Sequence, residues 1–353
     1  MFKLSYVNAS MKNAAIPNLR LFGSIRDGRS AAWLALWMAA LYSLNISYAQ
    51  TPQAVYPTKA IRLVVPFTPG GSADILGRTI AQELTQAWGQ PVVVENIGGA
   101  GGSIGADKVA KAPADGYTLL MGHIGTLAVN PSLYPKLPYN PVKDFAPVAW
   151  VARVPNILVV NAQLPVKNIQ ELIALAKSKP GQLSYGSGGN GSAANLATEY
   201  FKMQTNITLL HIPYRGTAPA VNDLMGGQIQ VLLTGAPAVM GHVKNGTLRA
   251  LAVSSPKRLA ALPDLPTVAE SGYKNFEADQ WYGVVAPAGT PRDIVLKLNH
   301  QINLALNGTE LRKRLTTEGA VAMPETPEVF GALIVQEIER WRPVITSGRV
   351  KSD

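Results

Sequence analysis

Residues 61–80 read IRLVVPFTPGGSADILGRTI, and the fold prediction starts from this stretch. Its first part, Ile61–Phe67, is a run of apolar and β-branched residues, which is typical of a buried strand. The strand breaks at Pro69-Gly70-Gly71, and apolar residues then recur at helical spacing, at Leu76 and Ile80. A buried strand that passes through a glycine turn into a helix is the basic unit of an α/β protein.

The same alternation of strands and helices continues along the chain. Asn168 and Glu171 have the spacing of a capping box that opens a helix, and Pro180-Gly181 ends that helix. This pattern predicts βαβ units and parallel sheets, arranged as two α/β domains with a cleft between them. The further strands are expected at 91–95, 117–121, 182–186, 207–213, 229–234 and 248–254. The further helices are expected at 103–112, 168–179, 192–204, 217–226, 236–244, 291–306, 309–318 and 326–346.

The N-terminal residues have the three-part pattern of an export signal. Residues 31–41, AAWLALWMAAL, form an uncharged apolar run after Arg26 and Arg29, and a polar stretch follows that ends with small residues at Ala49. The apolar run is short for a segment that spans a bilayer. We therefore expect residues 1–49 to be a cleavable signal peptide, and the alternative is a buried N-terminal helix.

The composition excludes several classes of site. The 353 residues include no cysteine, which rules out disulfides, thiolate zinc sites, iron–sulfur clusters and cysteine nucleophiles. The four histidines are too scattered for an obvious metal site. Residues 51–353 keep 27 of the 32 basic and 21 of the 22 acidic residues, a net charge of +6 that is spread along the chain. We therefore expect no metal, no nucleotide or redox cofactor and no nucleic-acid partner.

Three junctions between a strand and a helix are rich in glycine: residues 66–74, 96–107 and 185–195. Glycine lets the backbone turn tightly and approach a ligand, and the following helix presents unpaired N–H groups with partial positive charge. Such a corner binds phosphate or carboxylate. Ser72 and Ser192 would cap their helices or donate to the anion. The alternative is that these segments are only tight loops with caps.

The third junction also satisfies a nucleotide-binding pattern. Gly186, Gly188 and Gly191 have the spacing G-x-G-x-x-G. A dinucleotide fold needs an acidic residue at the end of the next strand to bind the ribose, whereas this strand ends His211-Ile212-Pro213. The pattern therefore does not predict a nucleotide site.

The second junction satisfies the nucleophile-elbow pattern G-x-S-x-G around Ser103. That elbow needs a strand that runs directly into its first glycine, and Ile97–Ala100 intervenes here. Histidines follow Ser103 in the chain, so a catalytic triad stays open. An exported serine hydrolase that uses Ser103 is therefore the alternative function.

Two pairs of residues near these segments have both a structural and a ligand-binding interpretation. Asp74 lies in a first helical turn, where a carboxylate stabilises the helix dipole, and Arg78 one turn later can pair with it. These positions favour a structural role for Asp74. Trp281 and Tyr282 either line a cleft or fill a core.

Seven motifs occur in order along the mature chain. They are YPTKAIRLVVPFTPGGSADILGR (56–78), VVVENIGGAGGSIGADKVAKAPADGYTLL (92–120), NPSLY (130–134), HIPYRGTAPAVNDLMGGQ (211–228), LRALAVSS (248–255), LPDLPTVAESG (262–272) and WYGVVAPAGTP (281–291). Together they resemble the Bug family of periplasmic solute receptors, the binding components of tripartite tricarboxylate transporters. The resemblance covers nearly the whole chain after the signal peptide.

The resemblance implies an α/β, two-lobed periplasmic-binding-protein fold of type II, the Venus-flytrap fold. Residues 50–154 and 277–353 would form lobe 1 and residues 155–276 lobe 2, with a two-segment hinge near Ala152–Val154 and Glu277–Gln280. It also implies that loops at Thr68–Ser72 and Ser187–Ser192 hold a carboxylate. The residues that we expect to contact the ligand are Phe67, Thr68, Gly70, Gly71, Ser72, Asp74, Ser187, Gly188, Gly189, Asn190, Gly191, Ser192, Asn195, Gly216, Thr217, Ala218 and Trp281.

Three positions depart from what is common in that family. Asn195 stands near the second loop where a histidine is frequent, and Gln230 and Thr234 stand where acidic or other polar residues are frequent. An amino-acid ligand needs a carboxylate partner for its ammonium group, so these positions favour a ligand with an uncharged tail. We also expect a side chain at Gly71 to obstruct the ligand and to force a disfavoured φ, and the 96–107 loop to make no carboxylate contact.

These observations predict an exported solute-binding protein of the periplasm and not an enzyme. Its partners would be a small organic acid, which it captures as a monomer, and the integral-membrane subunits of a transporter.

Overall fold

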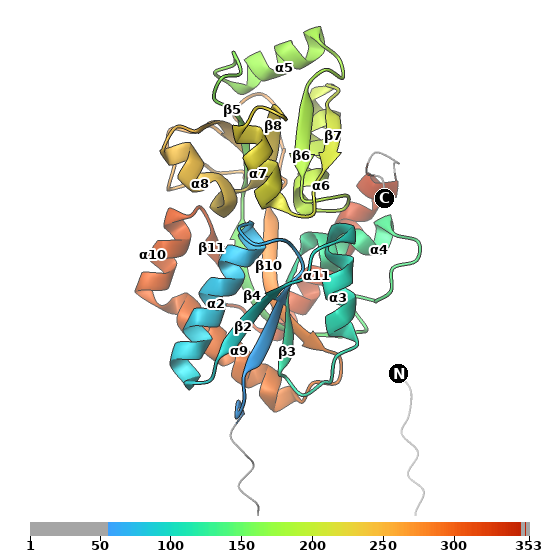
Figure 1. Ribbon diagram of the computed structural model, residues 1–353, viewed down its shortest axis with the longest axis vertical. Coiled ribbons are helices and arrows are strands. Elements are labelled where there is room, and N and C mark those ends of the chain that lie inside the picture. The colour runs from blue at the N-terminus through green and yellow to red at the C-terminus, as the bar shows by residue number, and fades with distance from the viewer. Residues whose placement is uncertain (1–55, 347–349, 351–353) are drawn as a thin grey trace, which may run out of the picture. The chain divides into compact units, whose positions relative to one another are not determined.

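The structure is a computed structural model that describes residues 56–346 and Val350 (Figure 1). The predicted signal peptide, residues 1–49, lies outside the described residues. Within the described part of the chain, no helix combines the length and apolar character that crossing a membrane requires.

The first sheet has six strands in the order β11-β4-β10-β3-β1-β2. Strand β1 runs parallel to β2 and to β3, whereas β10 runs antiparallel to β3 and to β4. The strands are β1 Ile61–Val65, β2 Val92–Asn96, β3 Thr118–His123, β4 Phe145–Val154, β10 Gln280–Pro287 and β11 Val321–Ala322.

The second sheet has five strands in the order β7-β6-β8-β5-β9. Strand β6 runs parallel to β7 and to β8, whereas β5 runs antiparallel to β8 and to β9. The strands are β5 Asn156–Asn161, β6 Ser184–Ser187, β7 Leu210–Pro213, β8 Val231–Gly235 and β9 Leu248–Val253.

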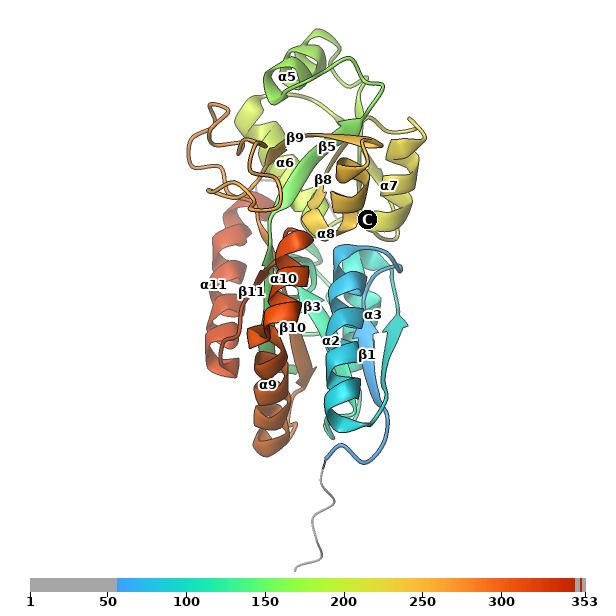
Figure 2. The ribbon, with the colours of Figure 1, turned by 90° about the vertical axis from the view of Figure 1, so that its left-hand side faces the viewer.

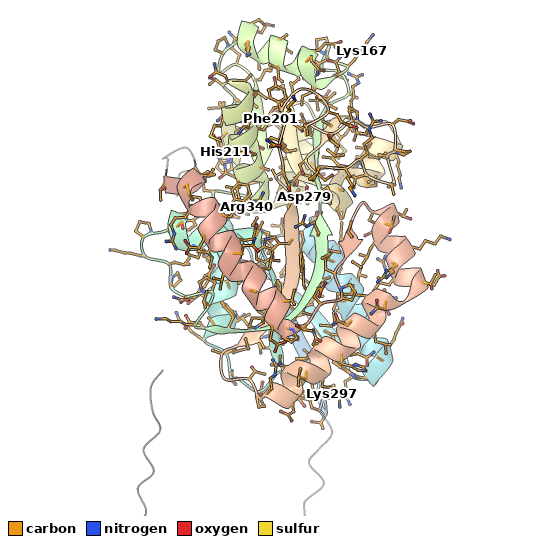
Figure 3. The ribbon with its side chains drawn as sticks, turned by 180° about the vertical axis from the view of Figure 1, so that it is seen from behind. Lys167, Phe201, His211, Asp279, Lys297 and Arg340 are labelled. Atoms are coloured by element: carbon orange, nitrogen blue, oxygen red, sulfur yellow. The ribbon has the colours of Figure 1, made fainter. Side chains whose placement is uncertain are left out.

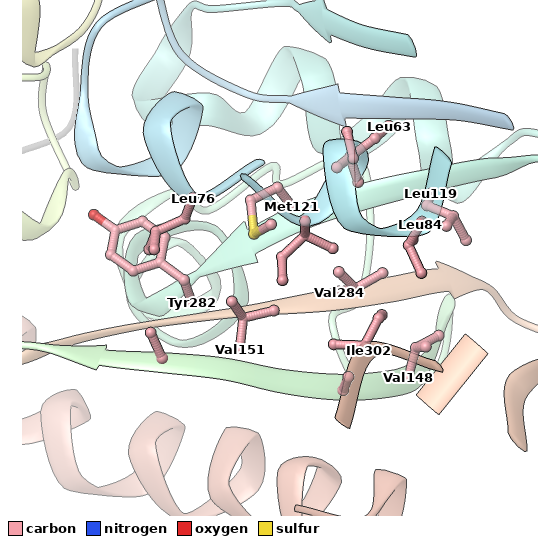
Figure 4. Close-up of a cluster of buried hydrophobic side chains, with 14 of the residues drawn as sticks. Leu63, Leu76, Leu84, Leu119, Met121, Val148, Val151, Tyr282, Val284 and Ile302 are labelled. Carbon is pink, nitrogen blue, oxygen red and sulfur yellow. The ribbon is translucent and has the colours of Figure 1, made fainter. Parts of the chain in front are cut away.

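Helices cover both faces of each sheet (Figures 1 and 2). Side chains alternate along β1, so Leu63 packs with Leu76 and Ile302 on one face (Figure 4), and Val64 packs with Ala106 on the other. The helices are α2 Ser72–Trp88, α3 Ser103–Ala110, α4 Asn130–Leu133, α5 Ile169–Ser178, α6 Ala193–Thr205, α7 Thr217–Met225, α8 Ala236–Lys244, α9 Arg292–Asn307, α10 Thr309–Thr317 and α11 Pro327–Thr346, with short helices η1 Ala100–Gly102 and η2 Gly125–Val129.

The chain passes between the two sheets twice. Strand β4 ends at Val154 in the first sheet, and β5 begins at Asn156 in the second. The return runs from Val253, the last residue of β9, to Gln280, the first residue of β10. The predicted α/β fold of two lobes is therefore confirmed. We call the lobe with the first sheet lobe 1 and the lobe with the second sheet lobe 2.

The prediction of parallel sheets is wrong, because both sheets are mixed. The antiparallel strands β4, β5 and β10 lie beside the two crossings and were not among the predicted strands. A parallel neighbour requires a crossover connection, usually a helix. Strand β10 instead comes into lobe 1 directly from lobe 2, so it runs opposite to β3.

The predicted capping box at the start of α5 is confirmed. The side chain of Asn168 accepts a hydrogen bond from the Glu171 N–H at 2.8 Å, and the Glu171 carboxylate accepts one from the Lys167 N–H at 2.6 Å. The helix therefore begins where the sequence predicts it.

Candidate functional site

Three helix N-termini meet at one small cavity between the lobes. Helix α2 of lobe 1 contributes Gly71 and Ser72, α6 of lobe 2 contributes Ser192, and α7 of lobe 2 contributes Thr217. The first turn of each helix has N–H groups without a partner inside the helix, and the helix dipole makes this end positive. The cavity is therefore suited to an anion.

The two serines at the cavity have different partners. Ser192 is the N-cap of α6, and its hydroxyl accepts a hydrogen bond from the Asn195 N–H at 3.3 Å. Ser72 donates to the carbonyl of Gly235 in lobe 2 at 3.4 Å. Because a hydroxyl both donates and accepts, Ser192 keeps its proton for a ligand while it caps the helix.

The second glycine turn is held in shape by residues that do not line the cavity. The Asn195 side chain accepts from the Gly191 N–H at 3.2 Å and donates to the Tyr185 hydroxyl at 2.9 Å. The Ser187 hydroxyl accepts from the Gly189 N–H at 3.1 Å and lies 2.6 Å from Nε2 of His211. Asn195 and Ser187 therefore orient the turn and do not reach the cavity.

Asp74 has the corresponding role in the first turn. Its carboxylate accepts hydrogen bonds from the Gly70 N–H at 2.9 Å, from Arg78 at 3.0 Å and from Asn96 at 2.9 Å. Burial raises the pKa of Asp74, but these hydrogen bonds outweigh burial and hold the pKa below its ordinary value. The structure places Asp74 beneath the turn and outside the cavity lining, which corrects its assignment as a ligand contact.

The remaining wall comes from lobe 1 and from the returning strand β10. Phe67 was predicted here, whereas His123 and Gln280 were not, and Tyr282 takes the cleft-lining role that the sequence left open. His123 ends β3, which pairs with β1, the strand that leads into the first turn. Because parallel strands end at the same edge of a sheet, the position of His123 was a usable signal.

His123 is a neutral hydrogen-bond donor. The Thr126 N–H donates to its Nδ1 at 3.2 Å, so the ring proton is on Nε2. Burial lowers the pKa of His123 to about 3. Its ring lies 4.6 Å from that of Phe67 and 5.7 Å from that of Tyr282, measured between centroids. This part of the wall is therefore aromatic and uncharged at physiological pH.

A chain of hydrogen bonds joins the cavity to both crossings. The Tyr282 hydroxyl donates to the Gln280 side chain, which donates to the Asn156 side chain at the start of β5. Asn156 in turn donates to the carbonyl of Ala278. Burial raises the pKa of Tyr282, so its hydroxyl keeps its proton.

Trp281 does not line the cavity, which corrects the prediction for this residue. Successive side chains of a strand point to opposite faces, so Trp281 faces away from Gln280 and Tyr282. Its indole N–H donates to Glu337 at 3.2 Å, and its ring lies edge-on to Phe330 at 5.8 Å. Trp281 therefore fills the core beneath α11.

Several residues that were predicted to contact the ligand lie where the two lobes contact each other. A Cβ atom on Gly216 would lie 2.0 Å from Oγ1 of Thr68, and one on Gly70 would lie 3.2 Å from Cβ of Ala218. These pairs join the first glycine turn of lobe 1 to the start of α7 in lobe 2. The small residues therefore let the lobes close, and they lie beside the cavity lining.

The 96–107 loop also lies at this contact. A Cβ atom on Gly101 would lie 2.4 Å from the carbonyl oxygen of Asn190, and one on Gly98 would lie 3.0 Å from that of Arg215. The Tyr134 hydroxyl donates to the same Asn190 carbonyl at 3.0 Å. The glycines of this loop therefore have a role in lobe contact that the sequence did not indicate.

The expectation of a disfavoured φ at Gly71 is wrong. Gly71 is the N-cap of α2 with φ −83°, which any residue adopts. A Cβ atom there would lie 3.5 Å from Cβ of Thr217, an ordinary contact. The strained position is Gly70, with φ +88°.

The nucleophile elbow, whose sequence pattern occurs around Ser103, is not formed, as the intervening residues Ile97–Ala100 indicated. The short helix η1 lies between β2 and Ser103, and the Ser103 hydroxyl accepts a hydrogen bond from Asn130 at 2.9 Å. In the described part of the chain, no histidine forms a hydrogen bond with Ser103. The geometry does not support the serine hydrolase.

Two of the positions that depart from the family pattern lie away from the cavity. Gln230 accepts hydrogen bonds from the N–H and hydroxyl of Ser184, both at 3.0 Å, and Thr234 is buried in β8. Among the described residues that line the cavity, none is Asp, Glu, Lys or Arg. The described lining residues therefore offer no carboxylate partner to an ammonium group.

The cavity has a volume of about 20 Å³, which is room for about one water molecule. An organic acid of several carbons does not fit this volume. A ligand of that size needs more room between the lobes than this arrangement gives.

Similar proteins of solved structure share this fold over nearly their whole length. The periplasmic binding protein BugD is 37% identical with a TM-score of 0.81, over 84% of this chain and 100% of that one. R. palustris Rpa4515 with adipate is 39% identical with a TM-score of 0.82, over 84% and 99% of the two chains. MatC (Rpa3494) from Rhodopseudomonas palustris with bound malate is 34% identical with a TM-score of 0.79, over 82% and 100%.

The sequence itself matches a family over most of its length. Residues 76–349 match the tripartite tricarboxylate transporter family receptor. Protein BugT of Bordetella pertussis is 43% identical over 291 residues, which is 82% of this chain and 89% of that protein. The resemblance to the Bug proteins is confirmed, and this chain belongs to the receptor family of the tripartite tricarboxylate transporters.

Proposed function

We propose that this protein is exported to the periplasm, closes its two lobes on a small organic carboxylate and delivers it to a membrane transporter. It acts as a monomer and is a receptor, not an enzyme. The family match supports this function, and so do the similar proteins solved with adipate and with malate. The hinge of this motion lies at the two crossings, near residues 152–154 and 277–280.

The observation that carries the proposal is the meeting of three helix N-termini at one cavity. A carboxylate placed there accepts hydrogen bonds from backbone N–H groups of α2 and α6 and from the hydroxyl of Ser192. These donors come from both lobes, so the ligand is fully bound only when both lobes close on it, with more room between them than the cavity of about 20 Å³ gives. Binding and closure are then one event.

The other end of the ligand meets an uncharged wall. His123, Gln280 and Tyr282 offer neutral polar groups, and Phe67 offers an aromatic face. A second carboxylate can accept from neutral donors such as the Nε2–H of His123. An ammonium group finds no carboxylate partner among the lining residues, and an unpaired charge is costly to bury. The preferred ligands are therefore organic acids without an amino group.

A thermal-shift screen of the mature protein tests the ligand class. Adipate, malate and other organic acids are compared with glutamate. A ligand at about a hundred times its dissociation constant stabilises the fold by about 2.7 kcal/mol. We expect at least one organic acid to raise Tm and glutamate to have no effect. A shift with glutamate alone, or with no compound of the panel, contradicts the proposal.

Two serine variants test the site. Ser192→Ala removes a hydroxyl that would bond the charged ligand, and it is expected to weaken binding by about 1.5–3 kcal/mol. Ser103→Ala is the matched control, because Ser103 lies in the other glycine loop and bonds Asn130. Calorimetric titration with the acid found in the screen compares them. Equal losses in both variants, or a loss in Ser103→Ala only, would show that the wrong loop was assigned.

A further inference from the structure

A second, larger groove lies at the β11 edge of the lobe 1 sheet. The cleft is built at β1, β3 and β10, whereas this groove is built at β4 and β11. Its walls are Arg153 and the 319–322 segment of lobe 1, Arg312 on α10, and residues 255–260 of lobe 2. Its volume is about 560 Å³, which is in the range of small-molecule sites. We call it the β11 groove, after the strand that is labelled β11 in Figure 2.

The rim of the β11 groove carries four cationic side chains and one carboxylate. Arg153 pairs with Glu277 at 3.3 Å, and Arg258 pairs with Glu270 at 2.9 Å. The other two cations are Lys257 and Arg312, and neither forms an ion pair with any residue that the structure describes. The carboxylate is that of Asp279, which forms no ion pair with either of these cations among the described residues, so the groove keeps one net positive charge when Asp279 is ionised.

Arg312 is held in place, although it has no acidic partner. Its guanidinium donates to the carbonyl of Leu306 at 3.1 Å and to the side chain of Asn307 at 2.8 Å. A guanidinium has five N–H donors, so these two contacts leave others for an anion. Arg312 therefore presents charge at a fixed position with little further loss of side-chain freedom.

The floor of the β11 groove is apolar. Leu259, Ala320 and Ala322 form part of it, and Val321 is 51% exposed there. An exposed valine beside cationic side chains can bury apolar surface against a ligand that has both a negative charge and an apolar body. Inorganic anions would use the rim only and leave the floor exposed.

We propose that the β11 groove is a second binding site, for a small amphipathic organic anion. The carboxylate or sulfonate of such a ligand bonds Arg312 and Lys257, and its aromatic or aliphatic body lies on Leu259 and Val321. This site is separate from the cleft, because its lining shares no residue with the cavity between the helix N-termini. It goes beyond the receptor function proposed above and does not depend on it.

A fluorescence titration with 8-anilinonaphthalene-1-sulfonate tests the proposal. This probe combines a sulfonate with an aromatic body, and its emission rises in apolar surroundings. We expect the mature protein to bind it saturably with one site. Arg312→Gln should weaken the affinity about threefold to tenfold, as expected for loss of a partly exposed charged contact. Absence of saturable binding overturns the proposal.

The matched control is Lys313→Gln. Lys313 is the next residue of α10, is also exposed and does not line the groove, so its variant should bind the probe like the wild type. A second groove variant, Ala260→Glu, adds a carboxylate at an exposed lining position, and it should also weaken binding. Equal affinities of the Arg312 and Lys313 variants overturn the proposal.

A competition experiment separates this site from the cleft. An organic acid that binds the cleft should leave the stoichiometry of probe binding at the β11 groove unchanged, because the two linings share no residue. The affinity for the probe is free to change, since the groove is lined from both lobes and lobe closure moves its walls. Stoichiometric displacement of the probe by that acid overturns the proposal. If no organic acid binds, the titrations with the three variants still decide whether the β11 groove is a site.

Discussion

The surroundings of Asp279, which is labelled in Figure 3, disfavour its charge. It lies in the segment that returns to lobe 1, and its carboxylate accepts a hydrogen bond from Ser254 at 2.8 Å. Burial is the main cause that raises its pKa to about 6, and the charge of Glu277 adds to this effect. The Ser254 hydrogen bond and the charges of Arg153 and Arg340 act in the opposite direction.

This shift has a consequence for the pH dependence of stability. The pKa of Asp279 is higher in the folded state than its ordinary value of 3.8. The stability linked to its proton is therefore complete below pH 3.8 and is lost as the pH rises through about 6. Above that pH the folded protein holds a partly buried carboxylate at the wall of the β11 groove.

Asp279→Asn is expected to remove the loss of stability that accompanies ionisation of Asp279. The amide oxygen still accepts from Ser254, so the variant should raise the free energy of unfolding by about 1–3 kcal/mol at pH 7.5 and change it little at pH 4. Urea denaturation at both pH values measures the difference. Asp264→Asn, at an exposed position, is the control and should behave like the wild type at both. If Asp279→Asn stabilises the protein more at pH 4 than at pH 7.5, the pKa of Asp279 is not raised in the folded state.

The sequence predicted some residues of the cavity and not others for physical reasons. Gly71, Gly188 and Ser192 belong to turns that precede a helix, a local pattern that is visible in the chain. His123 and Gln280 reach the cavity only because distant strands pair in the sheet. Neighbouring residues of a strand face opposite sides of the sheet, so a shift of one residue decides which side chain faces a ligand. The sequence around Trp281 and Tyr282 fitted either residue as the one that lines the cleft.

Among the elements, helix α11 is joined to the returning strand β10 by one buried carboxylate. Glu337 accepts hydrogen bonds from the indole N–H groups of Trp281 at 3.2 Å and Trp341 at 3.0 Å, and from Arg340 at 3.0 Å. Arg340 also donates to the carbonyl of Glu277, in the segment between the lobes, at 3.3 Å. The helix thus fixes the strand that carries part of the cavity wall.

Glu337→Ala is expected to destabilise the protein by about 2–4 kcal/mol, because two buried indole donors lose their acceptor. Glu339→Ala is the matched control, because this residue lies two positions further along α11, has a side chain that is 61% exposed and forms an exposed ion pair with Arg342. Glu339→Ala should change the free energy of unfolding by no more than about 0.5 kcal/mol. Urea denaturation of both variants measures the effect. Similar losses in the two variants would contradict the role of Glu337.

The elements themselves show what a sequence pattern can and cannot predict. Helix α8 begins and ends at the predicted residues, because glycine and proline mark its limits and its apolar positions have a helical period. Strands β4 and β5 follow each other almost without a break, so no helix or glycine turn marks them as two strands of different sheets. Their direction depends on the connection between lobes, which is a property of the complete chain.

For the whole molecule, the glycine turns form matching surfaces on the two lobes. Gly216 lies against Thr68, Gly101 lies against Asn190, and Tyr134 adds a hydrogen bond to the same backbone. These contacts join the two lobes directly, so they do not require a ligand between them. The contacts that hold the lobes together therefore also keep the cavity at about 20 Å³.

That small cavity has a consequence for the speed of binding. Because the closed lobes have no room for an organic acid, uptake has to pass through an open form. In a stopped-flow experiment, the observed rate should rise with ligand concentration and then level off at the rate of opening. A rate that stays proportional to concentration throughout would contradict this sequence of steps.

Tyr134→Phe removes the hydroxyl that joins lobe 1 to the Asn190 carbonyl. One net hydrogen bond of about 1 kcal/mol corresponds to about a fivefold faster opening, so the plateau rate should rise by this factor. Tyr139→Phe is the control, since its hydroxyl bonds Thr126 within lobe 1 and should leave the plateau unchanged. At high ligand concentration the number of molecules captured each second would then be set by how often the lobes part, and adding more ligand would not increase it.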